Sequence, residues 1–140
     1  MADILYTNFL SVLSSGLVDL SSDTLKIALL SGSYTPDATD SLYSDVSGYE
    51  AIGTNYSAGG KTLTSLGLTT SGTYLVATTD TVTWTNATIT ASGAVIYVSG
   101  ASAAEHYLVR WIELGDSTSV ASNFTINWSP SLGYLRLGAV

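Results

Sequence analysis

The sequence has no cysteine, two prolines, one histidine and one methionine among its 140 residues. Without cysteine there are no disulfides, thiolate nucleophiles or iron–sulfur ligands, and His106 is the only imidazole for acid–base or metal chemistry. Cations are also scarce: Lys26, Lys61, Arg110 and Arg136 are the four, and no two of them are close in sequence. A nucleic-acid groove needs clustered cations to neutralise phosphates, so we expect no DNA or RNA partner.

Long apolar runs are missing as well. No stretch reaches the roughly 18 uninterrupted apolar residues that a membrane span requires. Asp3 stands where a secretory signal would carry positive charge, and Thr7, Asn8 and Ser11 interrupt the apolar residues that follow. We therefore expect no signal peptide and no membrane partner, and we expect synthesis in a cytoplasm.

Small hydroxyl side chains take the place of the missing charge. The chain has 21 serines and 19 threonines, whereas charged residues make up 11%, compared with about 25% in an ordinary soluble domain. The formal net charge is −7. Threonine favours strands, and the length fits one domain over 1–140 that buries roughly 68–70% of the surface of its unfolded chain.

Apolar residues near the N-terminus follow helical spacing and predict one amphipathic helix over residues 3–15, ended by Gly16. The residues at this spacing are Ile4, Leu5, Phe9, Leu13 and Leu17. Most amphipathic helices face the core of their own domain, so we expect this one to cover an open end of a β core. Docking onto a partner is the alternative.

The rest of the chain alternates between strand patterns and Gly, Ser or Thr punctuation, apart from a long loop predicted over 31–49. The predicted strands are 24–30, 49–55, 61–69, 73–78, 81–84, 87–90, 93–99, 106–114, 122–128 and 132–138. Many short strands after one helix predict an all-β fold, with a single β-sandwich over 24–138 of immunoglobulin-like or jelly-roll type.

The residues predict no enzyme and no cofactor. His106 is not accompanied by a Gly-x-Ser-x-Gly nucleophile elbow. The acids available for glycoside hydrolysis are Glu50, Glu105, Glu113, Asp45, Asp80 and Asp116. Some of them will be close by chance, and a chain of this size has little material left for the walls of a cleft.

Metal and phosphate sites are not predicted either. Asp37, Asp40 and Asp45 lack the spacing of a helix-loop-helix calcium site, so we interpret them as a solvated acidic loop. The segment 59–62, Gly-Gly-Lys-Thr, lacks the first glycine of a phosphate-binding loop and precedes a strand pattern rather than a helix.

Three tryptophans, Trp84, Trp111 and Trp128, raise the alternative of a carbohydrate-binding module, because exposed aromatic rings stack on sugars. Trp84 and Trp128 are in phase with apolar neighbours, however, which favours a core or protein-interface role.

Several blocks in order along the chain carry a family resemblance. They are MADILYTNFL at 1–10, DL at 19–20, DTLKIAL at 23–29, YTPD at 34–37, GTNYSAGGKTL at 53–63, DTVTW at 80–84, ATITA at 87–91, AVIY at 94–97 and FTINW at 124–128. Together they resemble small structural proteins of tailed-bacteriophage virions. The chain extends beyond the expected end of that pattern with an apolar segment that starts at Pro130.

The resemblance implies a jelly-roll cement, or decoration, protein on the outside of the HK97-type capsid shell of a short-tailed phage. Its implied partner is the major capsid protein, and a neck or tail-fibre component is the alternative within virions. We expect a homo-oligomer, most simply a dimer. The contact is expected at helix 3–15 or at the arm from Pro130, and the interface candidates are Ile4, Leu5, Phe9, Tyr34, Tyr43, Tyr134, Leu135 and Leu137.

Overall fold

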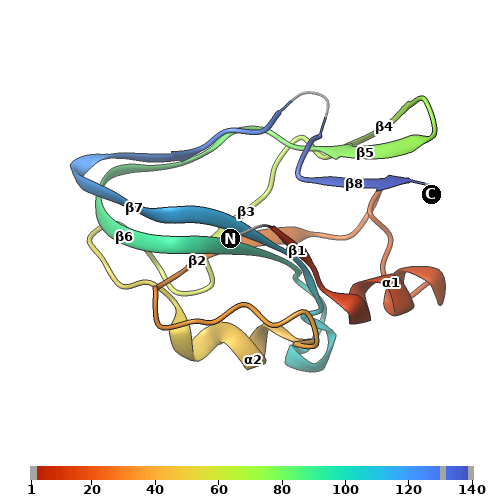
Figure 1. The fold of residues 1–140 in the computed structure, drawn as a ribbon, viewed down its shortest axis with the longest axis horizontal. Helices are drawn as coiled ribbons and strands as arrows, with labels where there is room; N and C mark the ends of the chain where they lie inside the picture. The colour runs from red at the N-terminus through yellow and green to blue at the C-terminus, as the bar shows by residue number, and fades with distance from the viewer. Residues whose placement is uncertain (1–2, 130–131, 139–140) are drawn as a thin grey trace.

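The computed structural model describes residues 3–129 and 132–138, and most of its regular structure is β. A five-stranded antiparallel sheet has the order β1-β7-β6-β2-β3, and a three-stranded antiparallel sheet has the order β4-β5-β8 (Figure 1). The strands are β1 (Ile4–Leu5), β2 (Leu25–Leu30), β3 (Lys61–Thr62), β4 (Gly67–Ser71), β5 (Tyr74–Thr78), β6 (Val82–Val98), β7 (Leu108–Ile126) and β8 (Leu135–Gly138). The helices are α1 (Thr7–Ser14) and α2 (Tyr43–Val46), with 3-10 turns η1 (Ser47–Tyr49) and η2 (Ala103–Glu105). The expected all-β class is confirmed.

One long hairpin, β6–β7, organises the molecule. Its ladder runs from Val82 opposite Ile126 to Tyr97 opposite Leu108, with several shifts of register. The separate strands predicted at 81–84, 87–90 and 93–99 are one strand, and so are those predicted at 106–114 and 122–128. The breaks predicted between these segments were wrong. The residues that suggested them form β-bulges, which bend a strand without ending it. The non-glycine bulge residues with positive φ are Asn86 (50°), Asp116 (55°) and Ala121 (45°).

The hairpin folds back on itself to make two layers. In Figure 1 both strands run along one layer, bend at the left and return in the other, where β4, β5 and β8 continue the second layer. The bend coincides with the register shift between Ala91 and Gly93 and with Gly115 (φ 63°) on β7. A large apolar cluster takes side chains from both halves of the hairpin, for example Trp84 and Ile96. The arrangement is therefore sandwich-like, with one strand pair contributing to both layers.

Helix α1 is shorter than predicted, because residues 4–5 form strand β1 instead. Ile4 pairs with Trp111 and Leu5 with Arg110 of β7, so the sheet edge takes this segment from the helix. In α1, Phe9 is buried in the large cluster. The helix thus covers one end of its own β core, as expected.

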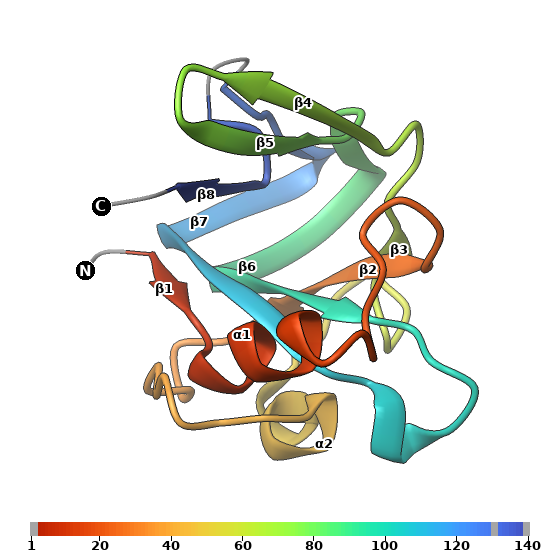
Figure 2. The same ribbon diagram turned by 90° about the vertical axis from the view of Figure 1, so that its right-hand side faces the viewer.

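The segment 31–49 is folded onto the sheet and contains α2 and η1. The segment lies on the side of the five-stranded sheet away from β4, β5 and β8 (Figure 2). Its Tyr34 and Val46 are buried in a second apolar cluster with Trp111 of β7. The predicted loop therefore covers this face of the sheet, and burial of its apolar side chains holds it there.

Three further predictions differ from the structure. The strand expected at 49–55 is reduced to two isolated bridges, Leu30 with Glu50 and Thr54 with Thr88. The strand at 61–69 divides into β3 and β4, and the strand at 132–138 shortens to β8. Strand β3 pairs with β2 and strand β4 pairs with β5, so the predicted strand 61–69 is divided between the two sheets. The strand predictions at 24–30 and 73–78 correspond to β2 and β5.

Candidate functional site

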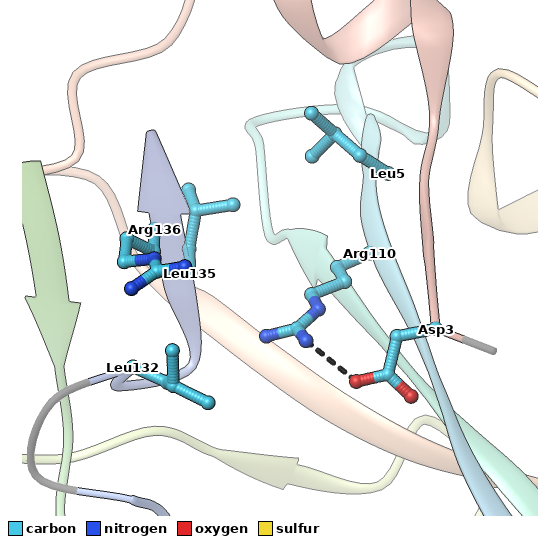
Figure 3. Close-up of a pocket in the computed structure, with 6 residues that line it drawn as sticks. All are labelled: Asp3, Leu5, Arg110, Leu132, Leu135 and Arg136. Atoms are coloured by element: carbon cyan, nitrogen blue, oxygen red, sulfur yellow. Dashed lines mark hydrogen bonds and ion pairs between the residues drawn. The ribbon is translucent and has the colours of Figure 1, made fainter. Parts of the chain in front are cut away.

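A groove opens between the edge strands β1 and β8, where the two layers part. We call it the β1–β8 groove; it has a volume of about 280 Å³ and is lined by Asp3, Leu5, Arg110, Leu132, Leu135 and Arg136 (Figure 3). An adjoining hollow of about 440 Å³ shares three of these residues and reaches Trp128. Each of the two strands is the last strand of its sheet. The groove therefore combines apolar walls, two arginines and two strand edges.

Arg110 holds the floor of this groove in place. It projects from β7, and its Nη2 forms an ion pair of 2.5 Å with Asp3 Oδ2 ahead of β1. Its Nη1 donates to the backbone carbonyl of Tyr134, just before β8, at 2.8 Å. The second oxygen of Asp3 accepts the backbone N–H of Glu113 at 2.9 Å. One arginine therefore ties β7 to the start of both edge strands.

Arg136 has a different environment. It projects from β8, is exposed, and its guanidinium lies 4.3 Å from the centre of the Tyr74 ring. Within residues 3–129 and 132–138 the one ion pair is that of Arg110 with Asp3, so Arg136 has no carboxylate partner among these residues. Stacking on an aromatic ring orients the guanidinium and leaves its edge free for a planar anion.

The interface candidates named from the sequence fall into two groups. Phe9, Tyr34, Tyr134 and Leu135 are at most 6% exposed and pack in the core of this chain. Ile4, Leu5, Tyr43 and Leu137 are partly exposed and pack against the same clusters. The candidates that line the β1–β8 groove are Leu5 and Leu135.

A hydrogen-bonded cluster around Glu50 anchors the segment between α2 and β3. Glu50 Oε2 accepts the Tyr43 hydroxyl at 2.6 Å, and Oε1 accepts the Tyr56 hydroxyl at 2.5 Å and the Gly59 N–H at 2.7 Å. Tyr56 Oη in turn accepts the N–H of Leu29 in β2 at 2.9 Å. Burial and the bond to Glu50 raise the pKa of both tyrosines above the ordinary value. These hydrogen bonds fasten segment 31–49, which we call the covering segment, and the chain that follows it to the sheet. We call the Glu50 cluster the latch.

A second polar chain lies under segment 31–49. The hydroxyls of Tyr6 and Tyr34 are 3.0 Å apart, and Tyr34 donates to Asp40 at 2.9 Å. Burial raises the pKa of Asp40, an effect that the Tyr34 hydrogen bond opposes and the nearby charges of Asp37 and Asp45 strengthen. No group of three or more possible metal-ligating side chains occurs in the described part of the chain, so these acids do not converge as a metal site.

The remaining candidates for chemistry have structural partners. Lys61 Nζ donates to the carbonyl of Thr83 at 2.6 Å and lies over the Trp84 ring. The ammonium group of the 59–62 segment is therefore engaged within the protein. Glu105 caps η2 through the N–H of Ser102. The ring of His106 lies 6.0 Å from that of Tyr97.

Two of the three tryptophans are inside the protein. Trp84 and Trp111 are 2% and 1% exposed, whereas Trp128 is partly exposed and donates from Nε1 to the Asp80 carbonyl at 3.0 Å. An aromatic platform for a sugar ring needs exposed faces, and these three side chains do not form one.

Two features of the sequence point toward the groove without identifying it. Arg110 falls on the same strand face as Leu108, Ile112 and Leu114, and a charge on an apolar face needs a nearby partner. Arg136 is the one charge between Leu135 and Leu137, and on a strand it lies on the face opposite these two leucines. Neither signal identifies Asp3 as the partner of Arg110, because 107 positions separate the two residues.

Two further observations bear on the class of protein. In the ranges that the structure describes, no helix is both long enough and apolar enough to cross a bilayer. Comparison of the chain with protein-family models, with curated proteins and with solved structures gave no match.

Proposed function

We propose that this chain is a non-enzymatic structural protein of a tailed-bacteriophage virion, a cement or decoration protein that binds the major capsid protein. It would act on the outer surface of an HK97-type shell and stabilise that shell against the pressure of packaged DNA. A protein that binds the assembled shell and not the free subunits shifts the balance toward assembly. No catalytic step or cofactor is part of this function.

The ordered run of sequence blocks that resemble virion proteins carries the proposal. The blocks extend from the first residues to Trp128, so they involve nearly the whole chain. The net charge of −7 supports an outer position, because an inner one would bring the acidic protein against the packaged genome.

The outer face of the β6–β7 hairpin supports an adhesive role. Threonine hydroxyls pair across the strands there, Thr83 with Thr125 at 3.1 Å and Thr90 with Thr118 at 3.0 Å. Charged residues are depleted at the centres of protein interfaces, and this face offers hydroxyls instead.

We also propose that the sandwich is of the jelly-roll type. The supporting feature is the long antiparallel strand pair that folds over itself, so that each of its strands takes part in both layers. Jelly rolls are double-sheet structures in which strand pairs wrap around one core.

Copy number tests the location. Quantitative mass spectrometry on gradient-purified particles from the source culture would measure copies of this chain relative to the major capsid protein. Hundreds of copies per particle are expected for a cement protein. A dozen or fewer would move the chain to the neck or tail, and its absence from particles would overturn the proposal.

The structure refines the test of the contact surface. Deleting the N-terminal segment would remove the buried Phe9 and unfold the core, so point variants are preferable. Leu10 and Leu17 are 47% and 61% exposed, and Leu10→Lys and Leu17→Lys leave the core intact. If this end of the molecule contacts the shell, both variants should lose co-sedimentation with shells that lack the protein. Binding equal to that of the unmodified chain would exclude this contact.

The proposed homo-oligomer has a direct test. Sedimentation of the purified chain should give a dimer mass, as expected for a protein placed on a two-fold axis of the shell. A single monomeric species at high concentration would contradict it.

A further inference from the structure

Strand β8 presents a free edge beside the β1–β8 groove. It is the last strand of the order β4-β5-β8, and no described strand pairs with its outer side. Its four residues, Leu135 to Gly138, include no proline, and the one charged side chain, Arg136, discourages pairing with a chain that does not bring an opposite charge. Unpaired N–H and C=O groups of such an edge can take up an extended segment as an extra strand.

The groove next to this edge is already shaped. Arg110 is held by Asp3 and by the Tyr134 carbonyl, so the spacing between β1 and β8 does not have to be created on binding. Leu5, Leu132 and Leu135 supply apolar wall, and Leu132 is 42% exposed. Alternate side chains of an added strand would point toward this wall.

The charges in the groove select the partner. Two of the four cations of a chain with 11 acids line this groove. Arg110 is neutralised by Asp3, whereas Arg136 is stacked on Tyr74 with no carboxylate partner among the described residues. A carboxylate is the group that matches such a guanidinium, because it can form two parallel hydrogen bonds with it.

The other free edges lack this combination. Strand β4, at the opposite side of the small sheet, has the sequence Gly-Leu-Thr-Thr-Ser and no cation. Strand β3 includes Lys61, but that ammonium already donates to the Thr83 carbonyl.

We infer that the β1–β8 groove binds an extended segment of a partner protein, which joins the edge of β8 and places a carboxylate against Arg136. The apolar side chains of this segment contact the leucine wall. The inference does not depend on the proposed function, since it follows from the groove, the free edge and the unpaired arginine. The proposed dimer is not assigned to this groove: its occupant is a segment of another protein, and a second copy of this chain is an outcome of the test below.

A peptide titration tests the inference. The probe is an acetylated peptide of alternating valine and threonine, seven residues long, that ends in glutamate with a free carboxylate. The control peptide ends in glutamine amide. Backbone NMR spectra of the full chain are recorded up to millimolar peptide, with the unmodified protein, Arg136→Gln and Lys26→Gln. Lys26→Gln removes the same charge from β2, outside the groove.

The expected result is saturable binding with shifts concentrated in β8 and β1. Arg136→Gln should weaken it by about fivefold, as loss of a partly exposed ion pair implies, and Lys26→Gln should leave it unchanged. The control peptide should bind the unmodified protein and Arg136→Gln equally. No saturable binding, equal losses in both variants, or shifts confined to β4 would overturn the inference. Shifts that follow protein concentration instead of peptide would assign the groove to a second copy and would also overturn it.

Discussion

Replacing Glu50 should loosen the segment between α2 and β3 far more than its position in an irregular stretch of chain implies. The carboxylate accepts three hydrogen bonds of 2.5 to 2.7 Å, two from tyrosine hydroxyls and one from the Gly59 N–H. Glu50→Gln keeps the shape and removes the negative charge. The amide oxygen of the glutamine can still accept two of these bonds. The amide NH₂ group would then face the third donor, a tyrosine hydroxyl, which must turn to accept a hydrogen bond instead of donating one.

The expected loss follows from these bonds. A hydrogen bond to a charged group contributes about 1 kcal/mol more than a neutral one, so three bonds give about 3 kcal/mol, which partial exposure reduces to about 2 kcal/mol. Glu50→Leu removes both acceptor oxygens and with them all three hydrogen bonds, and the expected loss rises to about 4 kcal/mol. For a chain of this length each 1 kcal/mol lowers the Tm by roughly 4 °C, so the two variants should lose about 8 °C and about 16 °C.

Urea unfolding followed by tryptophan fluorescence measures these losses, since Trp84 and Trp111 are buried. Glu105→Gln is the matched control, because exposed Glu105 accepts one N–H at 3.2 Å and should cost about 0.5 kcal/mol. A double-mutant cycle of Glu50→Gln with Tyr43→Phe should show coupling of about 1 kcal/mol. A loss for Glu50→Gln no larger than that of Glu105→Gln would refute the latch.

Three other predictions follow from the structure. Gly93→Ala should lower the free energy of unfolding by about 2 to 4 kcal/mol, because the new Cβ would lie 2.1 Å from the ring of Trp111 on β7. Gly48→Ala is the control: nothing lies within 4 Å of its new Cβ, so it should be near neutral in the same urea assay. Tyr134→Phe should leave stability unchanged or raise it by up to about 1 kcal/mol, because the buried hydroxyl lacks a partner among the described residues; a clear loss would reveal one. The raised pKa of Asp40 means that its contribution to stability is fullest below the unfolded value of 3.8 and is lost as pH rises through the higher folded value. Asp40→Asn should flatten that part of the stability–pH curve, and an unchanged slope would contradict the stated cause.

Sequence patterns located some strands well. The predicted strands at 24–30 and 73–78 match β2 and β5 to within one residue at each end. Both are short apolar segments flanked by Ser, Thr, Gly or Asp, and local preference agrees with tertiary pairing there. The segment 49–55 has the same local character, but only isolated bridges form because its backbone meets no continuous neighbouring strand.

Bulges explain why one hairpin was predicted as five strands. The pattern of polar and apolar residues is interrupted wherever an extra residue enters one strand, since each shift of one position exchanges the two faces. Gly115 and Asp116 have the residue types of a turn, but in the structure they form the bend at which β7 passes from one layer to the other. Only the partner strand decides between a turn and a bulge.

The candidate site shows a similar division. Arg110 on an apolar strand face signals a partner, but its partner Asp3 and the Tyr134 carbonyl come from opposite ends of the chain. Tyr34 and Tyr134, predicted as contacts for another protein, are buried because the covering segment and the small sheet close over them. Exposure of an aromatic residue depends on what folds onto it, which its neighbours in sequence do not record.

The sequence by itself determined the all-β class, the absence of thiol chemistry, the poverty of charge and the approximate place of β2 and β5, since these depend on composition or on local residue preferences. The tertiary structure alone decided that one hairpin builds both layers, that Glu50 latches the covering segment, and that two of four cations meet at the edge between β1 and β8. These features join residues distant in sequence, and their geometry exists only once the strands have paired.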